Sequence, residues 1–421
     1  MARRSAGQLA VYLGDELMGT LSDPGPGRFR FEYASQQVDQ AAGAIRLSAS
    51  LPVRARSYPN AAARPFFEGL LPEGAVRQAV ARSLGVSPDN GFALLGRIGW
   101  ECAGAVRVVP EGTPRPVGGD EVEWLTEREL AERIAQLASH PFGLSAANLR
   151  LSLGGVQEKL IVVRRGDGTI GIPLAGTPSS HLLKPGPVRF ESIVANELFC
   201  SRVLSSIGLA AARTAALDVG GTPCLLVERF DRVVGEDGQI MRLHQEDVCQ
   251  ALGILPAAKY EAEGGPSIAA TVGLIRTLSV RPAADVNAFL RAVIANFVLG
   301  NSDAHGKNFA VLYRELGRAA LAPLYDVVST AVYDVEPAMA MSIGGVFDPG
   351  AVDEHAWRAL AEQAGVGAAL LVREVRSLAA RIAASAQAVR ASAAEEGWHA
   401  PVLDRIVDVA GLSAAQLQRA R

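Results

Sequence analysis

A helical repeat of apolar residues leads into the most informative polar stretch of this chain. Six apolar residues recur at steps of three and four, which marks one buried face of a helix. They are Phe289, Leu290, Val293, Ile294, Phe297 and Val298. We expect the helix to end at Gly300, where the polar loop 300–308 begins. Two extended runs, 309–313 and 320–324, then lead to Asp326, so the pattern predicts helix, loop, hairpin and acid in that order.

The N-terminal part mixes strand and helix patterns. Apolar runs at 8–13 and 28–33 flank turn-forming Gly, Asp and Pro residues, which predicts a small antiparallel sheet. Helical spacing follows from Val76 to Leu84, and the Phe66–Phe67 pair is expected in the core. A Pro- and Gly-rich stretch from Pro110 to about Gly119 then marks a boundary.

A glycine-containing loop lies between two predicted strands, 148–153 and 160–163. Glycines allow backbone N–H groups to approach phosphate oxygens, because no Cβ is in the way. The candidate phosphate-binding residues are Gly154, Gly155, Val156, Gln157, Glu158 and Lys159. The spacing matches neither a dinucleotide fingerprint nor a Walker loop, so a plain hairpin remains an alternative at this point.

A short strand, 181–184, ends in Lys184, and a helix predicted from about 191 to 207 contains Glu197. A strand lysine paired with a helix glutamate is how kinases orient the α- and β-phosphates of ATP. A second hairpin, with strands at 214–219 and 224–231, leads out of the sheet where a hinge contacting adenine is expected.

The polar loop contains the residue types that phosphoryl transfer requires. That reaction needs a carboxylate to accept the hydroxyl proton and oxygen ligands that hold Mg²⁺ on the phosphates. Asp303 and Asn308 stand five positions apart, as the base and the metal-binding Asn do in kinases. Asp326 follows where a second metal ligand is needed, and His305 and Lys307 inside the loop indicate an atypical kinase.

Composition narrows the class of protein. The chain has 421 residues, which predicts two or three structural units. A net charge of -3 gives no global basic field for direct DNA binding. The four cysteines lack metal-ligand spacing, and neither a signal peptide nor a membrane-spanning run is expected. We therefore expect a cytoplasmic protein.

The chain also resembles a known family, the HipA toxins, which are serine/threonine kinases of bacterial type II toxin–antitoxin modules. The resemblance covers most of the chain, including residues 66–72 and 98–106. Its most specific pieces are Ser152–Lys159, Val227–Arg232, His244–Gln250 and Asp303–Phe309. It implies an α+β, two-lobed kinase-like fold: a mixed N-terminal lobe with an extra N-terminal subdomain, and a mainly helical C-terminal lobe. The expected units are the subdomain at 1–110, the N-lobe at 126–240 and the C-lobe at 241–421.

The resemblance further implies a role for each matching residue. Asp303 would accept the target hydroxyl proton, Asn308 and Asp326 would hold Mg²⁺, and Lys184 would contact the ATP phosphates. Ser152 matches an autophosphorylated serine whose modification switches the kinase off. The remaining nucleotide contacts would come from Glu228, Arg229, Phe230, His305, Gly306, Lys307 and Tyr325.

The resemblance also implies partners and a target. A HipB-type antitoxin would restrain the kinase and supply most of the DNA contact, while the phosphorylated target would be a translation component such as an aminoacyl-tRNA synthetase. Three alternatives stay open: a kinase acting on small molecules or lipids, a non-catalytic nucleotide-binding corepressor, and a metal-dependent hydrolase using Asp303, His305 and Asp326. The oxygen-rich set suits Mg²⁺ better than the transition metal such a hydrolase needs.

Overall fold

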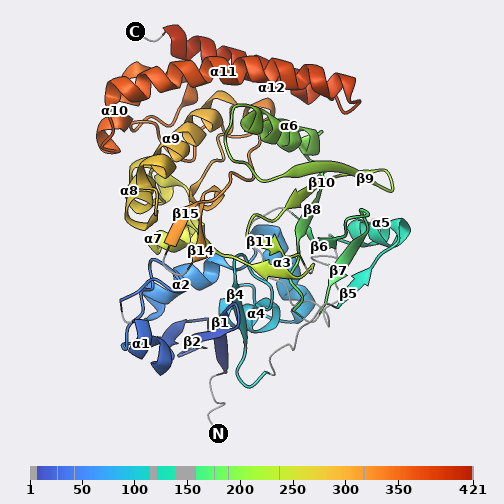
Figure 1. The fold of residues 1–421 in the computed structure, drawn as a ribbon, viewed down its shortest axis with the longest axis vertical. Helices are drawn as coiled ribbons and strands as arrows, with labels where there is room; N and C mark the ends of the chain where they lie inside the picture. Colours follow the sequence, from blue (N-terminus) through green and yellow to red (C-terminus); the bar gives the residue numbers. More distant parts are fainter. Residues whose placement is uncertain are drawn as a thin grey trace.

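The structure is a computed structural model of the chain. It describes residues 7–25, 27–41, 43–113, 121–137, 158–174, 176–187, 189–236, 238–315 and 318–419. The chain begins at one end of the molecule, passes through a central sheet, and finishes in long helices at the opposite end (Figure 1).

The N-terminal part is a four-stranded sheet with helices, as its sequence pattern predicts. The strand order is β3-β2-β1-β4, and every pair is antiparallel. Phe66 and Phe67 are fully buried, which confirms their predicted place in the core. The elements are β1 (Gln8–Leu13), β2 (Glu16–Ser22), β3 (Arg30–Tyr33), α1 (Ser35–Ala41), α2 (Asn60–Gly69), α3 (Gly74–Leu84), α4 (Gly91–Ile98) and β4 (Val106–Pro110).

A six-stranded antiparallel sheet occupies the middle of the molecule, in the order β5-β7-β6-β8-β10-β9. The predicted strand 148–153, Ser152 and loop residues 154–157 lie outside the described residues. This part contains β5 (Val122–Trp124), α5 (Glu127–Ala135), β6 (Leu160–Arg164), β7 (Ile170–Pro173), β8 (His181–Pro185), α6 (Ile193–Ser206), β9 (Thr214–Val219) and β10 (Thr222–Glu228).

One apolar cluster joins these two parts. Leu9 and Phe31 of the first sheet belong to the same buried cluster as Leu160 and Leu183 of the second. The boundaries expected at residues 110, 126 and 240 stay predictions, but the shared cluster shows that the first two units pack as one body.

Short strands between residues 232 and 247 were not expected from the sequence. They are β11 (Arg232–Val234), β12 (Ile240–Arg242) and β13 (His244–Asp247), and β13 pairs with the predicted hairpin of β14 (Ala310–Glu315) and β15 (Arg318–Leu321). The segment 338–343, by contrast, forms no strand. Its Ala340 instead donates its N–H to Ser302 and accepts one from Glu261, so loops take the place of a strand partner.

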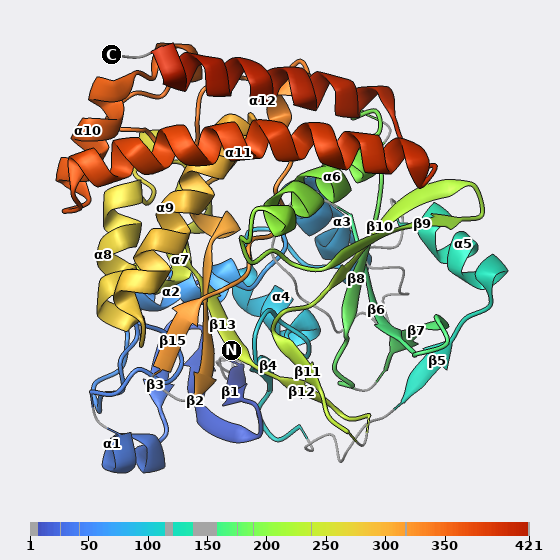
Figure 2. The ribbon, with the colours of Figure 1, turned by 45° about the horizontal axis from the view of Figure 1, so that its top comes forward.

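Helices build the C-terminal part. The apolar stripe predicted before Gly300 lies on α9, which ends at Val298, and Gly300 turns the chain with a φ of 69°. The two longest helices, α11 and α12, lie side by side across α6 and α9 (Figure 2). The helices are α7 (Val248–Leu252), α8 (Ile268–Leu278), α9 (Pro282–Val298), α10 (Glu354–Gln363), α11 (Ala368–Glu395) and α12 (Pro401–Arg419). Short 3₁₀ turns lie at Pro256–Ala258, Glu261–Glu263, Gly306–Asn308, Thr330–Val332 and Pro349–Ala351.

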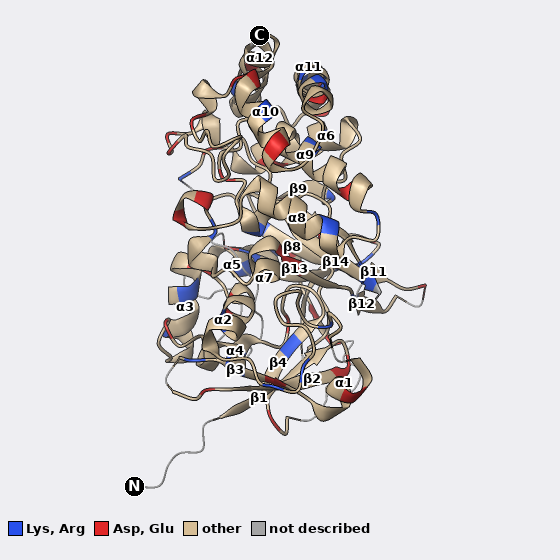
Figure 3. Ribbon diagram, turned by 90° about the vertical axis from the view of Figure 1, so that its left-hand side faces the viewer, with Lys and Arg blue, Asp and Glu red and all other residues tan. Residues whose placement is uncertain are grey.

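Basic and acidic residues are interspersed along the ribbon, in keeping with the small net charge (Figure 3). Among the described residues, no helix has both the length and the apolar character needed to cross a membrane.

Candidate active site

A cavity of about 980 Å³ brings the sequence-predicted residues together. It lies where β8 and β10 of the central sheet face the loop that follows α9. This volume is in the range of pockets that enclose a small ligand. The candidate residues that line it are Lys159, Lys184, Glu197, Glu228, Arg229, Phe230, Asp303, His305, Lys307, Asn308, Tyr325 and Asp326.

Lys184 lines this cavity and contacts two carboxylates. Its ammonium donates to Glu197 of α6 over 2.8 Å and to Asp326. Lys184 and Glu197 are buried, whereas the Asp326 side chain is 48% exposed. Asp326 can therefore contact a ligand in the cavity while Glu197 fixes the lysine from behind.

The contacts between Lys184 and Asp326 shift the pKa values of both groups. Burial opposes the charged form of Lys184, but Asp326 and Glu197 outweigh it and hold the pKa of Lys184 above its ordinary value. Burial likewise opposes the charge on Asp326, yet the ammonium groups of Lys184 and Lys159 keep its pKa below the ordinary value. The site therefore presents an ammonium and a carboxylate in their charged forms.

Asp303 lies on the exposed side of the loop after α9. Its Oδ1 accepts a hydrogen bond from the Tyr260 hydroxyl over 2.7 Å. The backbone N–H of His305 donates to the Asp303 carbonyl, and a 3₁₀ turn, Gly306–Asn308, then places Asn308 on the cavity wall. A carboxylate with one anchored oxygen and an exposed position is suited to accept a proton from a bound hydroxyl.

Asp326 has a left-handed backbone with φ of 53°, which is uncommon outside glycine although Asp tolerates it. The residue before it, Tyr325, makes two contacts. The Tyr325 hydroxyl donates to the Lys307 carbonyl over 2.6 Å, and its ring lies 5.5 Å from that of Phe230. Tyr325 thus ties the segment of Asp326 to the loop after α9 on one side and to Phe230 on the other.

The residues present fit a magnesium ion shared with a nucleotide. Asn308 and Asp326 both line the cavity and offer oxygen atoms. Within the described ranges, no three His, Cys, Asp or Glu side chains gather as a metal cage. Mg²⁺ commonly takes one or two carboxylates and completes its shell with substrate phosphates and water, which matches this donor set.

Two family models match most of this chain. A family model described as the HipA-like C-terminal domain matches residues 151–391, and one described as the HipA N-terminal domain matches residues 9–109. The chain belongs to the HipA family.

Relatives cover nearly the whole HipA-family chain. "Putative kinase Y4mE" of Sinorhizobium fredii is 40% identical over 375 residues, spanning 88% of this chain and 89% of that protein. The serine/threonine-protein kinase toxin HipA of Shewanella oneidensis is 31% identical over 394 residues, spanning 89% of this chain and 87% of that protein.

A solved structure of Shewanella oneidensis HipA with HipB and its operator DNA matches with a TM-score of 0.80 and 27% identity. The match covers 98% of this chain and 97% of that one. It confirms the kinase-like HipA fold expected from the sequence.

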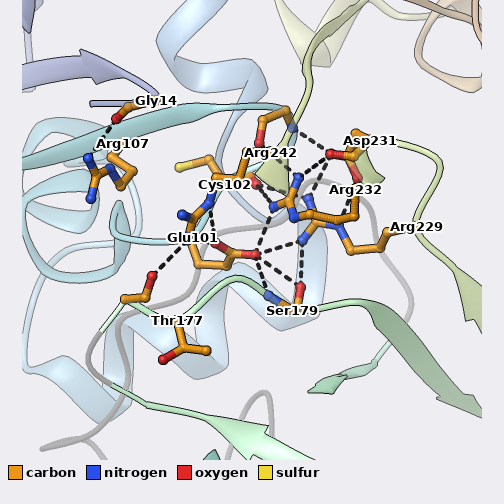
Figure 4. A network of polar contacts seen from close by, with 12 residues as sticks. Gly14, Glu101, Cys102, Arg107, Thr177, Ser179, Arg229, Asp231, Arg232 and Arg242 are labelled. Atoms are coloured by element: carbon orange, nitrogen blue, oxygen red, sulfur yellow. Dashed lines mark hydrogen bonds and ion pairs between the residues drawn. The ribbon is translucent and has the colours of Figure 1, made fainter. Parts of the chain in front are cut away.

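A buried ion network joins residues 229–242 of this HipA-family chain to its N-terminal part (Figure 4). The Arg229 guanidinium donates to Asp231, to Ser179 and to Glu101, which comes from the N-terminal part. Arg232 and Arg242 also bind Glu101. Arg229 also lines the cavity, so its nucleotide contact stays a prediction, and its side chain in addition bridges two parts of the protein.

Lys307 and Gly306 make close contacts with other parts of the protein. The Lys307 ammonium lies 2.8 Å from Asp247 and 3.6 Å from Glu73. A Cβ on Gly306 would lie 2.6 Å from Pro266 and 2.8 Å from Cys249, so close packing requires glycine there. Gly306 and the exposed Glu158 are not among the residues lining the cavity.

Tyr260 and Glu73 also line the cavity and were not singled out from the sequence. Glu73 directly follows the family-like stretch 66–72, so proximity to a motif was an available signal for it. Tyr260 has no comparable signal, since neither its spacing nor its neighbours connect it to Asp303.

Proposed function

We propose that this HipA-family chain is an ATP- and Mg²⁺-dependent serine/threonine kinase. The observation that carries the proposal is the contact of Lys184 with both Glu197 and Asp326 in the cavity that Asp303 and Asn308 also line. Relatives over most of the chain are named as kinases, including a serine/threonine kinase toxin.

In this proposal each side chain has one task. Lys184, fixed by Glu197, orients the ATP phosphates, and Asp303 accepts the proton of the target hydroxyl. Asn308 and Asp326 would hold Mg²⁺, which neutralises phosphate charge when bound. Phe230 and the Glu228 backbone region would contact adenine. Positioning and electrostatics supply most of the rate enhancement in such reactions.

We further propose that the chain is the toxin of a toxin–antitoxin pair in the cytoplasm. The matching Shewanella oneidensis protein was solved with HipB and operator DNA, which supports a HipB-type DNA-binding antitoxin as partner and DNA contact mainly through it. The target would be a translation component, such as an aminoacyl-tRNA synthetase. Autophosphorylation of Ser152 would add close to two negative charges beside the glycine loop and so oppose ATP binding.

The test is incubation of the purified protein with Mg²⁺ and γ-labelled ATP, followed by mass-spectrometric mapping of phosphorylated residues. Asp303→Ala should lower the transfer rate by about 10² to 10⁴, the usual contribution of a positioned general base. Asp408→Ala, at an exposed position on α12, is the matched control and should keep the wild-type rate.

Label on Ser152 in wild type, and its absence in Ser152→Ala, would establish autophosphorylation. Label transferred to small alcohols but not to serine peptides would favour a small-molecule kinase. ATP binding without any transfer would reject the kinase and favour a corepressor. Wild-type transfer by Asp303→Ala would refute the role of Asp303.

A further inference from the structure

The N-terminal part contacts the helical part directly beside the catalytic loop. The Ala49 N–H donates to Glu246 over 2.9 Å, and the Gln250 amide donates to the Phe66 carbonyl over 3.0 Å. His244 Nε2 lies 2.8 Å from the Leu47 carbonyl oxygen. Residues 244–250, to which the proposed chemistry assigns no role, therefore form the surface against which the N-terminal part packs.

Glu73 extends this contact toward the active site. At the end of α2, a Cβ on Gly69 would lie 2.6 Å from the Gln250 side chain, so α2 packs directly against residues 244–250. Glu73 then precedes α3, but its side chain makes no capping hydrogen bond to that helix. It reaches across the interface instead, 3.1 Å from the Lys259 ammonium and 3.6 Å from the Lys307 ammonium.

Both lysines hold the catalytic loop. Lys307 belongs to the loop, and the Lys259 carbonyl accepts the N–H of Gly306 over 3.2 Å. The residue after Lys259 is Tyr260, whose hydroxyl donates to Asp303. Glu73 thus contacts the loop through Lys307 and the segment that brackets it through Lys259.

These charges are shielded from water, which strengthens their interaction. The exposed fractions of the side chains are 16% for Glu73, 13% for Lys259 and 8% for Lys307. The Glu73 carboxylate lies within 3.6 Å of both ammonium groups, so its charge offsets the repulsion between them. Asp247 contacts Lys307 at 2.8 Å, while Glu73 contacts both lysines.

We propose that Glu73 is a positioning residue through which the docked N-terminal part holds the catalytic loop, and with it Asp303, in the geometry for phosphoryl transfer. This inference rests on the proposed role of Asp303 as the base. It makes turnover depend on a residue that lies outside the kinase lobes expected from the sequence, at 126–240 and 241–421.

The decisive variant is Glu73→Gln, which keeps the shape and removes the charge. Its kcat should fall by about 10- to 100-fold, because small misplacements of a catalytic group have effects of that size. Its KM for ATP should stay within about twofold, since the Lys184 side of the cavity is untouched. Asp15→Asn is the control, because it removes a charge paired with Arg107 inside the same N-terminal part.

Lys259→Met tests the same link from the other side of the interface. It should lower kcat similarly, and the double variant with Glu73→Gln should be little worse than either single one, as expected for residues acting as a unit. Fully multiplicative effects, or an unchanged kcat in Glu73→Gln, would overturn the proposal.

Hydrogen exchange separates this inference from the kinase proposal. Amides of residues 302–309 should exchange at least about tenfold faster in Glu73→Gln than in wild type and Asp15→Asn, because the loop opens locally more often. If wild type transfers no phosphate, the kinase proposal is rejected. Hydrogen exchange alone then tests the proposal that Glu73 holds the loop. Unchanged exchange in 302–309 would then refute it.

Discussion

The ion network around Glu101 allows a sharp prediction about stability. Glu101 is fully buried and accepts hydrogen bonds from Arg229 over 3.1 Å and Arg232 over 2.8 Å, while Arg242 binds its other oxygen. The change Glu101→Gln keeps the shape of this side chain and removes its charge. It leaves three arginines with Asp231 as their remaining carboxylate in the network.

The magnitude follows from this charge count. Three arginines and two carboxylates carry a net charge of one, and the substitution raises it to two in a buried site. Removing one partner of a buried ion pair typically costs about 3–5 kcal/mol. Since whole domains are stable by about 5–15 kcal/mol, the loss should be large.

Denaturant unfolding at pH 7 measures the loss. The matched control is Glu123→Gln, whose carboxylate pairs with Arg133 at 2.6 Å but is 39% exposed. Exposed pairs contribute about 0–1 kcal/mol, so this control should change little.

The pH dependence provides a second reading. Burial alone would raise the pKa of Glu101, but the three arginines outweigh it and hold the pKa well below the ordinary value of 4.5. A lowered folded-state pKa stabilises the protein above the ordinary pKa, and this contribution is lost as pH falls. The difference in free energy of unfolding between wild type and Glu101→Gln should therefore be largest at pH 7 and should decrease below about pH 4.5. A loss as small as that of Glu123→Gln would refute the role of Glu101 as counterion.

Two further predictions test the cavity and the helical core. Burial lowers the pKa of Lys159 from 10.5 to about 8, so its ammonium is charged below that pH and neutral above it. Calorimetry should therefore show that ATP affinity falls from pH 7 to 9. If the same fall in ATP affinity persists in Lys159→Met, it arises from a group other than Lys159. Trp357 is 1% exposed in the helical core, so Trp357→Ala should lower the free energy of unfolding by about 3–5 kcal/mol, and a loss below about 1 kcal/mol would contradict its place in that core.

The sequence by itself determined the order of elements and much of the candidate site. Helical spacing located α9, and the strand and helix patterns located Lys184 and Glu197 on β8 and α6. These assignments succeed because periodicity reports which face of an element is buried. The resemblance to the HipA family then assigned roles that no single residue indicates.

Tertiary structure decided which charged residues meet. Arg229 and Lys307 line the cavity, and their nucleotide contacts stay predictions. The structure adds ion pairs that no local pattern indicated, because the Arg229 guanidinium binds Glu101 and the Lys307 ammonium binds Asp247 and Glu73. The strand β13 was missed because four residues carry too little periodicity, and its partner β14 lies far along the chain. A local pattern shows that a side chain is buried, but which distant charge neutralises it depends on how the docked parts pack, and no spacing in the sequence records that.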